Sequence, residues 1–184
     1  MAWYMLERSR CTSSQASGGG VLGDILLGRE VVGAVEIGSY QREVLLARQA
    51  DGLLPCFPIW DDVTTFRVDN EETREYIEYL ISIRDELCIA GGFPCIDISV
   101  AGKGAGLDGE YSGLWFEMLR IVGEIRPKHI FVENSPMLTV RGLPRVLGGL
   151  TEAGYDCKWV VMGADGCGAP QKRNRLWLLG ERRE

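Results

Sequence analysis

The stretch LCIAGGFPCIDIS, residues 87–99, joins an apolar run to a turn that holds a cysteine. Residues 87–93 have the length and composition of a buried strand, and the glycines and the proline end that strand. Cysteine is most often buried as a small apolar side chain, whereas a thiol on a turn is more often one that reacts. Cys95 is therefore the first candidate for a catalytic residue.

Strands and helices alternate on both sides of this stretch. The pattern predicts strands over residues 31–37, 56–63, 87–93, 129–134, 155–162 and 175–181. It predicts helices over residues 39–49 (capped by Ser39), 71–86 (capped by Asn70), 113–125 and 143–154. Such alternation is typical of a parallel sheet that helices cover on both faces. We therefore expect an α/β fold with a doubly wound, mostly parallel sheet.

The composition is that of an ordinary globular domain: 184 residues, of which 46% are hydrophobic and 25% charged. A net charge of −6 does not by itself favour a nucleic-acid partner. The positive charges are nevertheless concentrated near the end of the chain, at Lys172, Arg173, Arg175, Arg182 and Arg183. The sequence thus predicts a local basic edge within an acidic protein.

The six cysteines show no metal-ligand spacing, and His129 is the one histidine, so we expect no metal site. The sequence has no signal-peptide pattern and no apolar run long enough to cross a bilayer. We therefore expect no membrane partner, reduced thiols and a cytoplasmic location.

Chemically useful residues stand at the ends of four expected strands: Glu36, Asp62, Cys95 and the pair Glu133–Asn134. In open α/β sheets, ligands bind at the carboxyl ends of the strands. Glycines 18–20 opening a helix over 20–28, followed by Glu36, have roughly the spacing of a nucleoside-binding unit, although a plain turn explains the glycines equally well. Asp62 could likewise bind an adenine amino group or cap a turn. Glu133 could form a salt bridge.

Three motifs in order carry a family resemblance: PCIDIS (94–99), FVENS (131–135) and QKRNR (171–175). With VEI and DDV at two earlier strand ends, they make residues 18–180 similar to the DNA cytosine-5 methyltransferase family. The resemblance implies an S-adenosylmethionine-dependent, Rossmann-like methyltransferase fold. It also implies that the chain transfers a methyl group to carbon 5 of cytosine in DNA, after the base has been flipped out of the duplex.

The resemblance also implies residue roles. Cys95 would add to carbon 6 of cytosine, Glu133 would hold the N3 edge, and Asn134 would support the loop. Arg173 and Arg175 would contact the cytosine carbonyl and the backbone, and the substrate-binding residues would include Ser99 and Gln171. The cofactor S-adenosylmethionine would be bound by Gly18, Gly20, Glu36, Ile37, Asp62, Val63 and Pro94. The glycine-rich segment AGKGAGLDGEYSG, residues 101–113, would close over the base or serve as a plain connector.

The sequence departs from the family pattern at Ile96, Tyr111 and Ala16, where glutamine, arginine and phenylalanine are usual. Residues 1–17 are an atypical segment, and we hypothesise that they are disordered or translated out of frame. Residues 18–184 then form the catalytic core, incomplete at the N-terminal strand and at the C-terminal end. The family's target-recognition domain would be missing, or supplied by a second chain.

Two other interpretations remain open. The first is an inactive or truncated core that binds S-adenosylmethionine and needs a partner chain for DNA recognition. The second is a thiol hydrolase with Cys95 as nucleophile and His129 as base, although we expect these two residues at opposite edges of the sheet. A restriction–modification enzyme and a virus-encoded protective methylase would look alike in this sequence.

Overall fold

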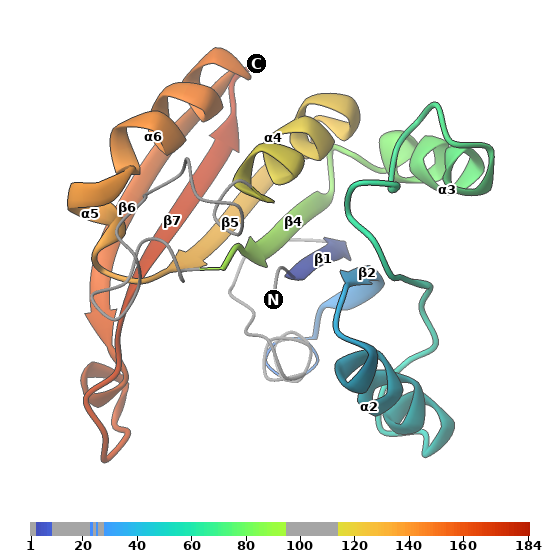
Figure 1. Cartoon of the computed structure of the whole chain (residues 1–184), viewed down its shortest axis with the longest axis horizontal. Helices are drawn as coiled ribbons and strands as arrows, with labels where there is room; N and C mark the ends of the chain where they lie inside the picture. Colours follow the sequence, from blue (N-terminus) through green and yellow to red (C-terminus); the bar gives the residue numbers. More distant parts are fainter. Residues whose placement is uncertain (1–2, 9–22, 24, 26–27, 95–113) are drawn as a thin grey trace.

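The computed structural model describes residues 3–8, 23, 25, 28–94 and 114–184, and for residues 3–8 it describes the backbone. The strands form one seven-stranded sheet in the order β3-β2-β1-β4-β5-β7-β6 (Figure 1). They are β1 (Trp3–Arg8), β2 (Glu30–Glu36), β3 (Ile59–Trp60), β4 (Leu87–Gly92), β5 (His129–Asn134), β6 (Tyr155–Gly163) and β7 (Asn174–Arg182).

Five of these strands run in one direction. β2 is parallel to β3 and β4 to β5, whereas β1 is antiparallel to β2 and β4, and β7 is antiparallel to β5 and β6. Four of the six neighbouring pairs are thus antiparallel, so the sheet is mixed instead of mostly parallel, although five of its seven strands point the same way and β1 and β7 are reversed.

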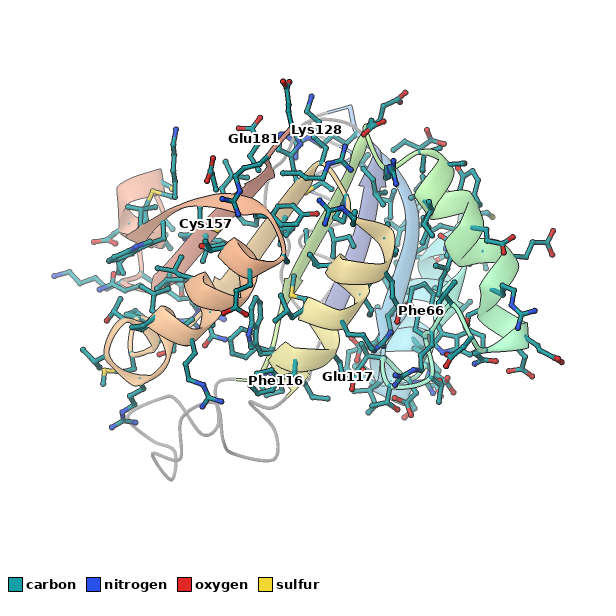
Figure 2. The ribbon with its side chains drawn as sticks, turned by 90° about the horizontal axis from the view of Figure 1, so that it is seen from above. Phe66, Phe116, Glu117, Lys128, Cys157 and Glu181 are labelled. Atoms are coloured by element: carbon teal, nitrogen blue, oxygen red, sulfur yellow. The ribbon has the colours of Figure 1, made fainter. Side chains whose placement is uncertain are left out.

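Helices cover both faces of the sheet. They are α2 (Ser39–Ala50), α3 (Glu71–Ser82), α4 (Leu114–Ile125), α5 (Leu138–Arg141) and α6 (Leu143–Glu152), with a 3₁₀ turn at Ala164–Cys167. Figure 2 shows α3, α4 and α6 side by side on one face, where they bury the larger core cluster. Leu45 of α2 belongs to a second cluster, with Val31 and Ala34 of β2, on the other face. The fold is thus the predicted doubly wound α/β arrangement.

Helix α4 shows how the sequence pattern produces this packing. Trp115, Met118, Val122 and Ile125 recur every three or four residues, so a 3.6-residue repeat brings them to one face of the helix. All four are buried. Burying each such side chain contributes about 1.5 to 3 kcal/mol, which makes this helix a main anchor of the layer that it belongs to.

Several element boundaries differ from the prediction. Strand β3 spans Ile59–Trp60 instead of 56–63, because Pro58 has no N–H for the ladder and the chain turns again at Asp62. Helix α3 ends at Ser82 instead of residue 86, and the carbonyl of Arg84 accepts a hydrogen bond from the N–H of Lys128. Asn70 caps this helix as predicted. The Ser39 cap is wrong: Gly38 is the N-cap of α2, and Ser39 is its first helical residue.

The N-terminal segment contains a feature that the sequence pattern does not predict. Residues Trp3–Arg8 form β1 in the middle of the sheet, with Trp3 opposite both Glu36 and Gly92. The expected strand would instead lead directly into the glycines at 18–20, which lie outside the described residues. Within the described ranges, no helix has the length and apolar composition needed to cross a membrane.

Candidate functional site

One edge of the sheet gathers most of the predicted site residues. The carboxyl ends of β2, β3, β4 and β5 meet there with the first residues of β7, because β7 is antiparallel to β5. We call this the site edge, defined by Glu36, Asp62, Pro94, Asn134 and Arg175. The site edge lies at the end of the molecule away from Lys128 and Glu181. Figure 2 shows Phe116 and Glu117, in the first turn of α4, at this end.

Glu133 and Arg175 form an ion pair at the site edge. Nε of Arg175 lies 2.7 Å from Oε1 of Glu133, and the two side chains are 27% and 19% exposed. Burial raises the pKa of Glu133 above its ordinary value, while the charges of Arg175 and Arg173 oppose that rise. The site therefore holds a carboxyl group with an increased tendency to keep a proton, next to a guanidinium group.

Asn134 connects β5 to the turn that precedes Cys95. Its Nδ2 donates to the carbonyl of Phe93 at 3.1 Å, and its Oδ1 accepts from the N–H of Ser135 at 2.7 Å. Asn134 is 2% exposed, and the ring of Phe93 packs against Trp115 with centroids 5.5 Å apart. Pro94, which follows Phe93, is buried. The backbone leading into the cysteine is thus held by a buried amide.

Glu36 is fully buried at the end of β2. Its Oε1 accepts a hydrogen bond from the N–H of Gly38 at 2.5 Å, and burial raises its pKa to about 7. Its Oε2 is buried without a hydrogen-bond partner in the described part of the chain. Buried polar atoms are rarely left unpaired, so this oxygen fits a ligand that brings a hydroxyl donor. Ile37, the next residue, is 52% exposed and offers an apolar surface beside it.

Asp62 adopts the turn-capping role. Its Oδ1 accepts from the N–H of Thr64 at 2.8 Å and from the hydroxyl of Thr64 at 2.7 Å. The second carboxylate oxygen forms no hydrogen bond or ion pair with the described residues. Asp62 also lines a cavity of about 700 Å³, with Arg42, Leu46 and Trp60. Among the described residues, Glu36, Ile37 and Val63 are not part of its wall, so this cavity does not unite the expected cofactor residues.

Two arginines that the sequence interpretation overlooked brace these strand ends. Nη1 of Arg42 donates to the carbonyls of Glu36 at 2.9 Å and Ile37 at 2.8 Å. Nη2 of Arg120 donates to the carbonyl of Val63 at 2.8 Å, across 57 residues of sequence. The sequence weakly indicates the contacts of Arg42, because the first turn of a helix that follows a strand faces the end of that strand. The sequence does not indicate the contact of Arg120 with Val63, because that contact depends on tertiary packing.

The expected basic edge divides into two parts. Lys172, Arg173 and Arg175 stand where the chain enters β7 at the site edge, and Lys172 and Arg173 are exposed, as is Gln171. Arg182 and Arg183 lie at the other end of this nine-residue strand, about 25 Å away at 3.3 Å per residue. Arg182 pairs there with Asp85, and Arg183 bonds the carbonyl of Thr151. Only the first group can act with Glu133.

His129 lies at the far edge of the sheet. It opens β5 opposite Cys88 at the start of β4, and its Nε2 is 3.8 Å from Oε1 of Glu181. Pro94, the residue before Cys95 in the sequence, follows the other end of β4, so this six-residue strand lies between His129 and Pro94. This position agrees with the prediction and argues against His129 as a base for Cys95. Several predicted site residues lie outside the described residues: Gly18, Gly20, Cys95 and Ser99.

The described part of the chain contains no group of three or more His, Cys, Asp or Glu residues that could hold a metal ion. The described cysteines carry thiol groups and form no disulfide: Cys56 and Cys167 are exposed, Cys157 is partly exposed, and Cys88 is buried.

Curated relatives share the central part of this sequence. The type II methyltransferase M.CviJI of Paramecium bursaria Chlorella virus IL3A is 40% identical over 97 residues, which are 52% of this chain and 26% of that protein. M.HhaI of Haemophilus parahaemolyticus is 32% identical over 102 residues, covering 53% of this chain and 31% of that protein. The chain thus spans about a quarter to a third of the length of these relatives.

Solved structures share the fold. The S. pombe Dnmt2 methyltransferase superposes with a TM-score of 0.64 at 14% identity, over 90% of this chain and 46% of that chain. A DNA modification methyltransferase described as putative, encoded within an E. coli prophage, gives a TM-score of 0.59 at 21% identity, over 83% and 40% of the two chains. The sequence model of the C-5 cytosine-specific DNA methylases matches residues 59–184, more than half of the chain. The chain therefore belongs to the C-5 cytosine-specific DNA methylase family.

Proposed function

We propose that this chain transfers a methyl group from S-adenosylmethionine to carbon 5 of cytosine in DNA, through a covalent bond between Cys95 and carbon 6. The observation that carries the proposal is the Glu133–Arg175 pair, 2.7 Å apart at the site edge. It stands on the strand next to β4, which leads through Phe93 and Pro94 into Cys95. A carboxyl group with a raised pKa and a guanidinium group match the N3 and carbonyl edge of a cytosine.

The residues around Glu36 fit the cofactor. The unpaired, buried Oε2 of Glu36 would accept from the ribose hydroxyls, and the exposed side chain of Ile37 would lie against the adenine. The free oxygen of Asp62 would accept from the adenine amino group, with Val63, Pro94, Gly18 and Gly20 completing the site. When bound, S-adenosylmethionine supplies an electrophilic methyl group.

The protein's part in the reaction is to make carbon 5 of cytosine nucleophilic. The Cys95 thiolate would bond to carbon 6, and the electrons of the 5,6 double bond would move onto carbon 5 and toward N3. Glu133 would donate a hydrogen bond to N3 in its protonated form and stabilise that charge, and burial, which raises its pKa, favours that form. After methylation, loss of the proton from carbon 5 would re-form the double bond and expel the Cys95 thiolate.

The neighbouring residues would hold the reacting groups in position. Asn134 would fix the turn before Cys95 through its bond to the Phe93 carbonyl. Arg175 would contact the cytosine carbonyl, and Arg173 the nearby phosphate backbone, with Gln171 ordering them and Ser99 adding a substrate contact. Since the target atom is hidden inside a duplex, the DNA partner would present a flipped-out cytosine. The exposed Lys172 and Arg173 provide positive charge at this edge.

Trapping with 5-fluorocytosine tests the proposal. Fluorine at carbon 5 cannot leave as a proton, so a working site remains bonded to the DNA and migrates as an adduct in a denaturing gel. We expect an adduct that depends on S-adenosylmethionine and disappears in Cys95→Ser, while Cys88→Ser, at a buried cysteine far from the site edge, retains it. Wild-type protein that forms no adduct with double- or single-stranded DNA would refute the proposal.

A second candidate is a cofactor-binding core that acts only with a partner chain. One observation favours it: Trp159, Val160, Val161 and Met162 of β6 are each at least 38% exposed. Such an apolar run is unusual on a free surface. This candidate predicts that S-adenosylmethionine binds in calorimetry while no adduct forms until the partner is added.

A further inference from the structure

Gly92 is the last residue of β4, opposite Glu133 in the parallel ladder between β4 and β5. A Cβ atom at Gly92 would lie 3.1 Å from the Glu133 carbonyl oxygen and 3.2 Å from Glu133 Oε2. Both distances are shorter than the roughly 3.5 to 4.0 Å of an ordinary van der Waals contact. The carbonyl and the carboxylate of Glu133 would therefore both have to shift by a few tenths of an ångström to admit a side chain at position 92.

The usual reason for a glycine does not apply to this position. The glycines with positive φ in the described ranges are Gly28, Gly52, Gly142, Gly154 and Gly168, so Gly92 has a backbone that other residues can adopt. Glycine in a strand also costs conformational entropy and packs nothing. Some other requirement must therefore favour glycine here, and the close approach of Glu133 supplies one.

The carboxylate of Glu133 cannot simply move away from an added methyl group. Its Oε1 lies 2.7 Å from Nε of Arg175, and its Oε2 lies over Gly92. Because the carboxylate is planar and rigid, pushing Oε2 away by a few tenths of an ångström turns Oε1 out of line with Arg175. The side chain is only 19% exposed, which leaves few alternative rotamers.

We propose that Gly92 is a positioning residue: its missing side chain leaves the space that lets Glu133 meet the cytosine base while paired with Arg175. This inference rests on the proposed function, since it concerns the residue that would hold N3 of the base. Gly92 touches no reacting atom and acts through Glu133.

The test is a double-mutant cycle between Gly92→Ala and Glu133→Asp, with Gly123→Ala as matched control. Gly123 is a glycine of α4 whose added Cβ would have nothing within 4 Å. The readouts are the rate of 5-fluorocytosine adduct formation at saturating DNA, the concentration of DNA that gives half this rate, and the melting temperature. We expect Gly92→Ala to slow the adduct at least tenfold with little change in the DNA concentration, and Gly123→Ala to react like the wild type.

The cycle separates positioning from general destabilisation. Aspartate is one methylene shorter, so its carboxylate withdraws from the methyl group, whereas the 3.1 Å contact with the carbonyl of residue 133 is the same in both backgrounds. Gly92→Ala should therefore slow the Glu133→Asp variant by less than threefold, and the difference between the two backgrounds measures the contact with the carboxylate. An equal loss in both backgrounds, or an unimpaired Gly92→Ala, would overturn the role of Gly92. If Gly92→Ala alone does not fold, the proposal requires that the double variant folds, and an unfolded double variant contradicts it. A wild-type chain without any adduct refutes the proposed function, a result that is distinct from both outcomes for Gly92.

Discussion

Replacing Arg120 by methionine should destabilise the fold more than the loss of any exposed ion pair. The Arg120 side chain is 17% exposed, and its guanidinium group makes contacts of 2.8 Å with Glu117, Glu124 and the carbonyl of Val63. Glu124 in turn accepts from the N–H of Val68 at 3.2 Å. The group therefore ties α4 to the loop after β3, and its loss leaves two half-buried carboxylates and one carbonyl without their donor.

The contacts set the expected magnitude. Removing one partner of a buried ion pair costs about 3 to 5 kcal/mol, and the partial exposure of Glu117 and Glu124 reduces this to about 2 to 3 kcal/mol. For a chain of this size, that loss lowers the melting temperature by about 5 to 10 °C. Because Val63 follows Asp62, we also expect S-adenosylmethionine to bind several-fold more weakly.

Arg48→Met provides the matched control. Arg48 also forms a 2.8 Å ion pair three residues away on a helix, with Asp51, but the two side chains are 48% and 50% exposed. Exposed pairs contribute about 0.5 kcal/mol, so the melting temperature should fall by about 2 °C or less. The assay is thermal unfolding followed by circular dichroism, with calorimetric titration of the cofactor. Equal losses in the two variants would refute the claim that burial and the Val63 contact make Arg120 special.

Three further perturbations have defined outcomes. Burial raises the pKa of Glu36 from 4.5 to about 7, so the folded state binds more protons than the unfolded state between these pH values. The free energy of unfolding should therefore fall by about 3 kcal/mol as the pH rises from 4.5 to 7. Urea unfolding at several pH values measures this fall, and a Glu36→Gln variant with the same pH dependence would contradict the prediction. Asn134→Ala leaves the buried Phe93 carbonyl unpaired, which lowers the free energy of unfolding by about 1 to 3 kcal/mol. We also expect the 5-fluorocytosine adduct to form more slowly. An unchanged rate of adduct formation would exclude a role for Asn134 in holding the turn. Asn70→Ala removes the helix cap bonded to the Glu72 N–H and should cost about 1 kcal/mol by urea unfolding without changing adduct formation, whereas Asn70→Ser should cost less.

Sequence patterns predicted the elements that hydrophobic periodicity encodes. Strands β4 and β5 and helix α4 begin and end within one residue of the predicted bounds. The site edge was predictable for the same reason, since strand ends carry the polar residues Glu36 and Glu133. The strand β1 was not predicted at all, because residues 1–17 do not have the pattern expected of a first strand that leads into glycines. A strand pattern also does not encode direction, so the antiparallel position of β1 between β2 and β4 could not be foreseen either.

The support around the site was equally hidden from the sequence. The contact between Arg120 and the Val63 carbonyl joins residues 57 positions apart, and no local pattern signals such a pair. Gly92 was visible as a glycine before Phe-Pro-Cys, but a glycine in a turn has several explanations. Only the position of the Glu133 carboxylate above it distinguishes among them. The family motifs thus point to the reacting groups that we propose, while the packing shows which residues contact Glu133 and the turn before Cys95.

The most direct test of the central claim is to identify the residue that bonds to DNA. The chain would be incubated with S-adenosylmethionine and 5-fluorocytosine DNA, digested with protease and nuclease, and analysed by mass spectrometry. We predict that the peptide containing Cys95 gains the mass of the methylated fluorocytosine nucleotide, and that the same peptide from Glu133→Gln gains far less. An unmodified Cys95 peptide, or the nucleotide on one of the described free cysteines instead, would contradict it.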